Sequence, residues 1–278
     1  MTHSFSLGYS TCPNDTFMFY ALAHRRISCG GLDFDITLDD IETLNQKARS
    51  RVMDISKLSF AAMGHLAESY GLLRSGAALG RGCGPLIISR PGTDLNRLHS
   101  SRTAVPGMWT TACLLLGLYL EETPNVHPMP FDQIMPAVKR GDYDFGVIIH
   151  EGRFTYGRYG LQCRVDLGCW WEEKTGLPLP LGGICVRRDI DPIHVRQIES
   201  SIRESIRYGY ANRNETLGYI RRHAQEMSRE VVDQHIDLYV NDFSVDLGDE
   251  GVTAVQTLFS HARSLGIIPD GRVPLFAC

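Results

Sequence analysis

Residues 144–151 are Asp-Phe-Gly-Val-Ile-Ile-His-Glu, a short apolar run rich in β-branched side chains that ends in an imidazole and a carboxylate. The run predicts a buried strand over residues 145–149. In open α/β sheets the ligand crevice lies at the carboxyl ends of the strands, which is where His150 falls. Histidine has an ordinary pKa near 6.5, so it can take a proton and return it. Two interpretations of His150 follow, a general base or a histidine that is merely hydrogen-bonded at a strand end.

Strands and helices alternate on both sides of this stretch, which predicts an α/β fold with mainly parallel sheets. Two turn-rich segments, residues 91–93 and 178–183, interrupt the alternation. They divide the chain into two predicted lobes, with residues 1–91 and 183–278 in lobe 1 and residues 92–182 in lobe 2. The C-terminal third shows only helical patterns. Strands are expected at residues 5–9, 32–38, 54–58, 71–79, 83–89, 102–105, 126–129, 145–149, 163–167 and 184–187.

The composition is that of an ordinary globular protein. Apolar residues make up 43% and charged residues 22% of the 278 residues, enough for one large or two medium domains. The formal charge of −4 offers no basic surface, so neither nucleic acid nor a membrane is an expected partner. The N-terminus has no secretory signal pattern, and no apolar stretch approaches the ~20 residues of a membrane span. A cytoplasmic location is therefore expected.

Cysteine and histidine spacing argues against a metal site. The eight cysteines are scattered, and neither C-x-x-C nor H-E-x-x-H occurs. In a reducing cytoplasm free thiols are expected. No G-x-S-x-G elbow occurs and nothing marks a cysteine as activated, which favours general-base chemistry over a covalent nucleophile.

Three predicted loop-to-helix starts carry hydrogen-bond donors. Thr110 and Thr111 follow a Pro-Gly turn, and a helix start there offers free N–H groups and a dipole that suit a carboxylate or phosphate. Ser59 opens another helix just after Lys57, and residues 12–16 (Cys-Pro-Asn-Asp-Thr) open a third. Each has a simpler interpretation, with the hydroxyls as N-caps and the lysine solvated. Together they predict donors from both lobes that face one cleft.

Glycine clusters and a tryptophan pair complete the candidate features. Gly80, Gly82 and Gly84, and the pair Gly182-Gly183, match neither a dinucleotide nor a P-loop motif, so they are interpreted as turns and hinge points. The pair Trp170-Trp171 fits the wall of an aromatic ligand site and the core equally.

Several longer motifs follow one another in a fixed order along the first two thirds of the chain. They are residues 9–17 (Tyr-Ser-Thr-Cys-Pro-Asn-Asp-Thr-Phe), 54–59 (Asp-Ile-Ser-Lys-Leu-Ser), 80–85 (Gly-Arg-Gly-Cys-Gly-Pro), 110–112 (Thr-Thr-Ala), 146–151 (Gly-Val-Ile-Ile-His-Glu) with 153–156 (Arg-Phe-Thr-Tyr), 166–168 (Asp-Leu-Gly) with Trp170-Trp171, and 178–183 (Pro-Leu-Pro-Leu-Gly-Gly). In these motifs the chain resembles the 1,4-dihydroxy-6-naphthoate synthase family of the futalosine route to menaquinone. The helical C-terminal third is less distinctive.

The resemblance implies a two-lobed, periplasmic-binding-protein-like (type II) α/β fold with a ligand cleft between the lobes. It implies a lyase that converts cyclic dehypoxanthine futalosine, a spiro-fused carboxylate, to 1,4-dihydroxy-6-naphthoate and releases a small sugar-derived fragment. No metal, flavin or nicotinamide cofactor is implied. The proton acceptor of the family corresponds to His150. Its substrate-contacting residues correspond to Lys57, Leu58, Ser59, Thr110 and Thr111.

Two other functions are compatible with the same fold. The first is a solute-binding protein that closes on a small carboxylate without chemistry. The second is chorismate dehydratase, although residues 148–156 (Ile-Ile-His-Glu-x-Arg-Phe-Thr-Tyr) favour the naphthoate synthase. The sequence leaves open the oligomeric state and the extent of lobe closure. It also leaves open whether Glu151 tunes His150, and whether Asn14, Asp15 or Lys57 touches the ligand. An apolar helix face with Val231, Ile236 and Val240 fits a dimer contact as well as the core.

Overall fold

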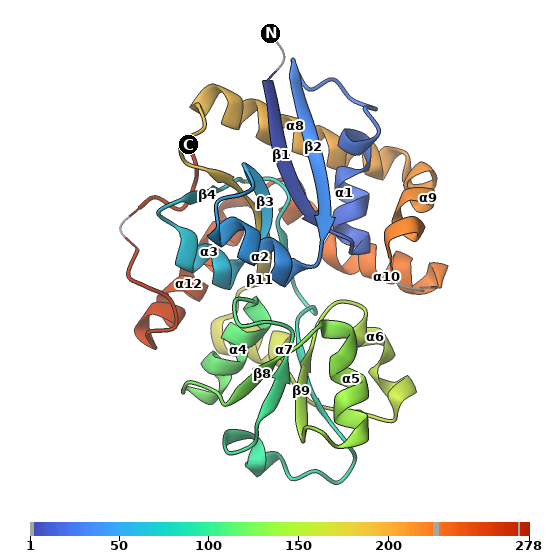
Figure 1. Ribbon diagram of the computed structural model, residues 1–278, viewed down its shortest axis with the longest axis vertical. Helices are drawn as coiled ribbons and strands as arrows, with labels where there is room; N and C mark the ends of the chain where they lie inside the picture. Colours follow the sequence, from blue (N-terminus) through green and yellow to red (C-terminus); the bar gives the residue numbers. More distant parts are fainter. Residues whose placement is uncertain (1–2, 225–227, 272) are drawn as a thin grey trace.

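The computed structural model describes residues 3–224, 228–271 and 273–278, and its strands form two separate sheets. Figure 1 shows the sheets one above the other along the long axis of the molecule, with both ends of the chain in the upper half. We call the upper sheet and its helices the first lobe, and the lower sheet and its helices the second lobe. The chain passes from the first lobe to the second and returns, so the first lobe contains both ends of the sequence.

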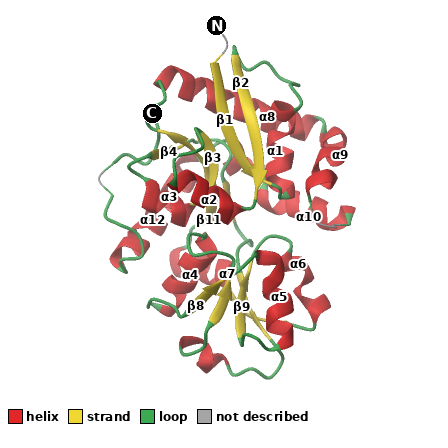
Figure 2. Ribbon diagram, viewed as in Figure 1, coloured by secondary structure: helices red, strands yellow, loops and turns green. Residues whose placement is uncertain are grey.

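The first sheet has the strand order β2-β1-β3-β11-β4, and β5 also pairs with β11. Its strands are β1 (His3–Ser10), β2 (Leu32–Asp39), β3 (Ile55–Ser59), β4 (Tyr70–Leu72), β5 (Ala78–Gly80) and β11 (Leu179–Arg187). Strand β1 is parallel to β2 and β3, whereas β11 is antiparallel to β3, β4 and β5. Strands β1 and β2 end at the edge that faces the second sheet (Figure 2), so loops after the parallel strands reach the space between the lobes.

The second sheet has the strand order β10-β6-β9-β7-β8. Its strands are β6 (Leu86–Ser89), β7 (Thr103–Val105), β8 (Val126–Pro128), β9 (Phe145–Ile148) and β10 (Gln162–Asp166). Strand β7 is parallel to β8 and β9, whereas β6 is antiparallel to β9 and β10. The apolar run at residues 145–149 therefore contains β9, an interior strand with all four residues buried.

Helices cover both faces of each sheet. In the first lobe, α1 (Pro13–Ala23), α8 (Pro192–Ala211), α9 (Arg213–His223) and α10 (Arg229–Tyr239) cover one face, and α2 (Ile41–Arg49), α3 (Phe60–Leu66) and α12 (Gly248–Ser264) the other. In the second lobe, α4 (Thr111–Leu120) and α7 (Leu167–Thr175) cover one face and α5 (Phe131–Arg140) the other. The short helices are α6 (Gly152–Thr155), α11 (Asp242–Val245) and the 3₁₀ turns Leu95–His99 and Tyr156–Tyr159.

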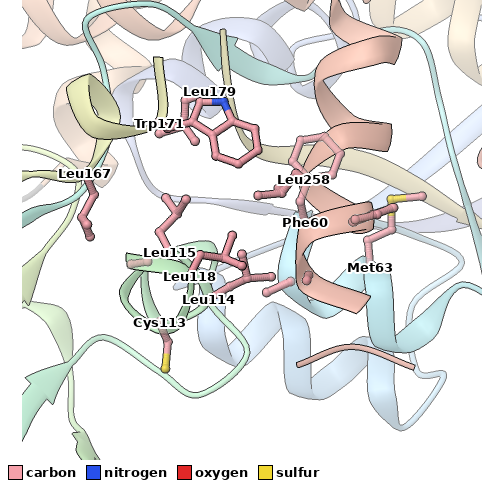
Figure 3. Close-up of a cluster of buried hydrophobic side chains, with 14 of the residues drawn as sticks. Phe60, Met63, Cys113, Leu114, Leu115, Leu118, Leu167, Trp171, Leu179 and Leu258 are labelled. Atoms are coloured by element: carbon pink, nitrogen blue, oxygen red, sulfur yellow. The ribbon is translucent and has the colours of Figure 1, made fainter. Parts of the chain in front are cut away.

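The largest buried cluster joins the two lobes. Phe60 of α3 and Leu258 of α12 belong to the first lobe, and they share this cluster with Leu114 and Leu115 of α4 in the second (Figure 3). A fully buried side chain of this size stabilises the fold by roughly 1.5–3 kcal/mol. The two lobes therefore share a continuous apolar core on this side of the molecule.

The sheets correct the predicted division of the chain. Strand β6 belongs to the second sheet, so the first crossing lies before residue 86 and not at residues 91–93. Strand β11 already begins at Leu179 in the first sheet, ahead of the predicted restart at residue 183. The glycine-rich turns at residues 80–85, where Gly82 and Gly84 have positive φ, mark the first crossing better than the Pro-Gly pair does.

The two crossing strands also correct the expectation of mainly parallel sheets. Two neighbouring strands can be parallel only when a long crossover connection joins them. Helix α1 forms this connection between β1 and β2, and helix α4 forms it between β7 and β8. Strands β6 and β11 each follow a connection that arrives from the other lobe. Both are antiparallel to their neighbours, so each sheet is mixed.

The structure also describes the thiols, the helix lengths and the apolar face near the C-terminus. All eight cysteines are free. Among the described residues, no helix is long and apolar enough to cross a membrane. The side chains of Val231, Ile236 and Val240 are buried within the single chain, so this face belongs to the core and offers no open surface to a second copy.

Candidate active site

A cavity of about 90 Å³ lies between the two sheets. The first lobe contributes Ser10, Asn14, Asp15, Lys57 and Ser59, and helix α10 adds His235 and Tyr239. The second lobe contributes Thr110, Thr111, Ile149 and His150. The loops after β1, β3, β7 and β9 thus meet here, which is where an open α/β sheet places its ligand.

His150 lies two residues beyond β9, in a left-handed backbone conformation with a φ of 54°. Such a conformation costs a residue other than glycine about 1–3 kcal/mol, and it concentrates at functional sites. The ring of Phe131 meets the imidazole edge-on, with 5.2 Å between centroids. Burial lowers the pKa of His150, although the carboxylates of Glu151 and Asp15 oppose this shift. The imidazole is therefore neutral at neutral pH and has a lone pair to offer.

Cys12 contacts His150 from the opposite lobe. It is the N-cap residue of α1, and its Sγ lies 3.3 Å from His150 Nδ1. Burial raises the pKa of the Cys12 thiol, and the nearby carboxylate of Glu151 adds to the shift. The sulfur is therefore a protonated thiol, and the sequence analysis did not include it among the candidate site residues.

Asp15 and Lys57 form a buried ion pair beside the cavity. Lys57 Nζ lies 3.2 Å from Asp15 Oδ1, and the two side chains are only 5% and 1% exposed. The ammonium group also donates to the carbonyl of Gly76, and Asp15 accepts from both the N–H and the hydroxyl of Ser10. Lys57 is thus not the solvated lysine that the sequence allowed. The pair adds no net charge to the cavity.

The other predicted residues of β3 differ in where their side chains point. Ser59 lines the cavity, as Lys57 does, whereas Leu58 is fully buried in the core on the opposite face of the strand. Strand alternation dictates this, so the side chain of Leu58 does not contribute to the cavity wall. Ser59 is the N-cap residue of α3, but its hydroxyl makes no capping bond and instead accepts from Asn45 at 3.3 Å. Its hydrogen has no acceptor among the described residues and can be donated to a ligand.

Thr110 and Thr111 begin α4 as predicted, but their hydroxyls are used within the fold. Thr110 Oγ1 accepts from the N–H of Cys113 and donates to the carbonyl of Gly107. Thr111 Oγ1 donates to the carbonyl of Leu181 at 2.6 Å. The N-capping interpretation is therefore right for Thr110. The N–H of Cys113 is capped by Thr110 and that of Leu114 begins the intrahelical bonds, so the helix start offers a ligand the backbone N–H groups of Thr111 and Ala112.

His235 on α10 is a cavity residue that the sequence analysis missed. It is 1% exposed, and its Nε2 lies 3.1 Å from Asn14 Oδ1. The amide of Asn14 donates to Asp15, so its oxygen accepts and His235 Nε2 is the protonated nitrogen. Nδ1 has no partner among the described residues. Burial lowers the pKa of His235 to about 3, so the ring is neutral. The sequence of α10 shows only the alternation of apolar and polar residues of an amphipathic helix, and this pattern does not indicate that His235 belongs to a site.

Two uncertain features of the sequence lie outside the cavity wall. Glu151 makes no capping bond at α6 and does not line the cavity, but its charge acts on His150. Trp171 is buried and donates to the carbonyl of Pro178, while Trp170 packs against Tyr119. The tryptophan pair is therefore core packing. Within the described ranges, no cluster of three or more histidine, cysteine, aspartate or glutamate residues could hold a metal ion.

Solved structures with little sequence identity define the class of protein. A conserved Candida albicans gene product, described as having the generic periplasmic binding protein fold, has a TM-score of 0.69 at 12% identity, covering 96% of this chain and 92% of that one. At this identity the likeness shows the fold alone. The chain thus has a two-lobed, periplasmic-binding-protein-like α/β fold with its cavity between the lobes.

Closer relatives identify the family. The family model described as menaquinone biosynthesis matches residues 5–264. The chain is 48% identical to a 1,4-dihydroxy-6-naphthoate synthase of Thermus thermophilus, over 97% of this chain and 98% of the relative, and 42% identical to one of Streptomyces coelicolor, over 95% and 94%. A solved protein of Archaeoglobus fulgidus has a TM-score of 0.89 at 35% identity, over 96% of this chain and 99% of that one. The chain belongs to the 1,4-dihydroxy-6-naphthoate synthase family and is an enzyme of menaquinone biosynthesis.

Proposed function

We propose that this enzyme is a carbon–carbon lyase that converts cyclic dehypoxanthine futalosine to 1,4-dihydroxy-6-naphthoate, with His150 as the general base. The observation that carries the proposal is the position of a neutral imidazole in the wall of a cavity built from both lobes. A general base must hold a lone pair at working pH and lie within reach of the proton it removes. His150 meets the first condition because burial lowers its pKa.

The carboxylate of the substrate binds at the start of α4. The free N–H groups there and the positive end of the helix dipole favour an anion. Because the hydroxyls of Thr110 and Thr111 are used within the fold, the backbone and not these side chains is the donor. Ser59 adds a hydroxyl from the first lobe. Lys57 neutralises the carboxylate of Asp15, so this carboxylate does not repel an anionic ligand.

The rest of the cavity suits a planar ring system. Ile41, Ile149 and Leu181 supply apolar wall, and burial of ring carbons there contributes roughly 25 cal/mol per Å² of apolar surface. The polar groups are few and lie at the edges, as in most small-molecule sites. Aromatisation of the product drives the reaction, and no external electron acceptor is needed to balance it.

The proton taken by His150 creates an imidazolium, and two carboxylates partly offset the cost of burying its charge. Burial lowers the pKa of His150, and the carboxylates of Glu151 and Asp15 act against this shift without reversing it. A positioned general base typically contributes about 100- to 10,000-fold to the rate. His150 is expected to contribute within this range.

Two variants of His150 test the proposal. His150→Asn keeps a side chain that tolerates positive φ but has no basic nitrogen, and His150→Gly relieves the backbone and opens space. Purified protein is incubated with cyclic dehypoxanthine futalosine and the naphthoate is followed by chromatography. Both variants should lose about 100- to 10,000-fold in kcat, and added imidazole should restore part of the activity of His150→Gly only.

The outcomes separate the alternatives. Undiminished turnover in His150→Asn would remove His150 from the mechanism. Ligand-induced thermal stabilisation of the native protein without product would favour a binding role. Turnover of chorismate, with none of the cyclic futalosine derivative, would favour the dehydratase.

A further inference from the structure

We propose that Trp109 is a positioning residue for the anion site at the start of α4, and that Arg49 and His65 hold it there from the opposite lobe. The inference rests on the proposed function for the carboxylate that the site binds. The contacts themselves do not depend on that ligand. Trp109 comes directly before Thr110, the N-cap residue of α4, so the position of its loop sets where the free N–H groups of this helix lie.

The ring of Trp109 contacts two helices of the first lobe. The imidazole of His65 on α3 stacks on it, with 4.9 Å between centroids and 17° between planes. The guanidinium carbon of Arg49 on α2 lies 5.2 Å from the centroid of the same side chain. Figure 1 shows α2 and α3 at the edge of the first lobe that faces α4. One half-buried side chain of the second lobe is therefore held by a histidine and an arginine of the first.

The charges of these two contacts suit an aromatic ring. Burial lowers the pKa of His65, so its imidazole is neutral at neutral pH and stacks without a charge to desolvate. The guanidinium group of Arg49 stays charged, and tryptophan is the aromatic residue that attracts a cation most strongly. Both contacts have preferred geometries. They fix the angle of the loop, which the apolar core between the lobes does not do because the hydrophobic effect is non-directional.

The backbone beside Trp109 is also held from the first lobe. Asn45 of α2 donates to the carbonyl of Trp109 at 3.3 Å. Gly107 has a φ of 155°, and a Cβ there would lie 2.5 Å from the carboxyl group of Glu42, which also belongs to α2. Only glycine permits this approach. Residues 107–109 thus meet the first lobe through their backbone as well as through the indole ring.

These contacts connect the two halves of the anion site. The second lobe supplies the first N–H groups of α4, and the first lobe supplies the hydroxyl of Ser59. The amide nitrogen of Asn45 joins the halves, because it lies 3.3 Å from both the hydroxyl oxygen of Ser59 and the carbonyl oxygen of Trp109. A carboxylate has two acceptor oxygens, so its binding to both halves depends on the distance between them. The contacts of Trp109 hold that distance.

The expected effect of losing these contacts is a moderate loss of affinity. Thr111 donates to the carbonyl of Leu181 in the first lobe, and the apolar core also joins the lobes, so the site is misaligned but not separated. Aromatic and cation–π contacts are each worth about threefold to tenfold in an equilibrium constant. Trp109→Leu should therefore raise KM for cyclic dehypoxanthine futalosine by about threefold to tenfold and change kcat by less than about twofold. Arg49→Met should act in the same direction.

Trp170 supplies matched controls. It is also half-buried, it meets Tyr119 edge-on at 5.6 Å, and Lys174 Nζ lies 5.1 Å from its ring. All three residues belong to the second lobe, and none lines the cavity. Trp170→Leu and Lys174→Met should therefore leave KM unchanged. Trp109→Phe keeps a ring and Arg49→Lys keeps a cation, so each should recover part of the affinity.

The split between KM and kcat separates positioning from a structural role. A variant that only loses folded protein lowers the measured kcat and leaves KM unchanged. That result in Trp109→Leu would overturn the inference, and so would an equal rise of KM in Trp170→Leu.

Calorimetric titration of the full-length protein with 1,4-dihydroxy-6-naphthoate measures binding without turnover. Trp109→Leu should raise its Kd by about threefold to tenfold. The Kd of 1,4-dihydroxynaphthalene, which has the same rings without the carboxylate and is titrated without oxygen, should change much less. Equal losses for the two compounds would show that Trp109 acts on the ring system and not on the anion site, which would refute the inference.

The outcomes also separate this inference from the proposed function. KM values of Trp109→Leu and Arg49→Met that match those of Trp170→Leu and Lys174→Met, with product formed by the native enzyme, would refute the role of Trp109 and leave the lyase intact. A native protein that binds the naphthoate without forming it, and that loses affinity in Trp109→Leu, would uphold the role of Trp109 and refute the lyase. Neither binding nor product in the native protein would refute both.

Discussion

The buried pair of Lys57 and Asp15 makes a strong prediction about stability. At the observed 3.2 Å, the attraction between two unit charges is about 5 kcal/mol at an effective dielectric constant near 20. Much of this offsets the cost of removing both charges from water. Lys57→Met keeps the length of the side chain but leaves the Asp15 carboxylate buried without its cation. We expect that variant to lose about 3–5 kcal/mol of unfolding free energy.

A double-mutant cycle isolates the pair. Asp15→Asn alone should also be strongly destabilising, because it leaves the ammonium group of Lys57 in the protein interior. The double variant Lys57→Met/Asp15→Asn removes both charges, so its loss should be clearly smaller than the sum of the two single losses. The expected interaction energy is about 2–3 kcal/mol, at the upper end of values for residues in contact.

Urea unfolding followed by tryptophan fluorescence measures these free-energy differences. The urea midpoints of the variants are compared with the dependence of the unfolding free energy on urea concentration held constant. The exposed pair of Arg25 and Asp33, in which the arginine side chain is 81% exposed, supplies the control. Arg25→Met should change the unfolding free energy by less than about 0.5 kcal/mol. A loss below about 1 kcal/mol in Lys57→Met, or additive single losses, would show that the pair is not the buried, coupled unit that the distances indicate.

Three further predictions concern pH and backbone packing. Because burial lowers the pKa of His150, the acid limb of kcat/KM should have its midpoint below about 6.5, and a midpoint above that value would contradict the neutral base. Burial lowers the pKa of His235 to about 3, so the unfolded chain binds a proton there that the native protein does not. The stability that this neutral ring contributes is complete above about pH 6.5 and falls by up to ~1.4 kcal/mol per pH unit as the solution is acidified. In His235→Gln the urea midpoint should therefore depend less on pH below about 6.5. An unchanged pH dependence would show that the ring is not buried and neutral. A Cβ on Gly168 would lie 1.8 Å from the carbonyl oxygen of Cys83, so Gly168→Ala should lower the unfolding free energy by about 2 kcal/mol or more, whereas Gly218→Ala in α9 meets nothing within 4 Å and should be neutral or stabilising in the same titration.

Much of the fold follows from local patterns in the sequence. The β-branched run at residues 145–149 gave β9, and the Pro-Gly turn before Thr110 gave the start of α4. The strands at which the chain changes lobe were harder to place, because a crossing has no hydrophobic period of its own. In the structure Gly82 and Gly84 have positive φ at the first crossing. In the sequence, however, a glycine-rich turn inside one lobe would have the same composition as this crossing.

The site was only partly visible in the sequence for a related reason. His150, Lys57 and Ser59 lie at the ends of strands, where topology alone brings them to the cavity. His235 comes from a helix far along the chain, and its burial depends on how α10 packs against α1. Nothing in the sequence marks Cys12 as activated, because the histidine that it contacts is 138 positions away. Such contacts between lobes are tertiary facts that no local spacing encodes.

The backbone of His150 explains how one short segment presents two neighbouring side chains to the same cavity. In a regular strand successive side chains point to opposite faces, so Ile149 and His150 would be separated. Both line the cavity, because β9 ends at Ile148 and the left-handed conformation of His150 reverses the direction of its side chain. The apolar wall and the base are thus placed together at the expense of local strain. A β-branched replacement such as His150→Val would tolerate this backbone poorly, whereas His150→Asn would keep it. Loss of activity in the asparagine variant therefore reports the missing imidazole and not a collapsed turn.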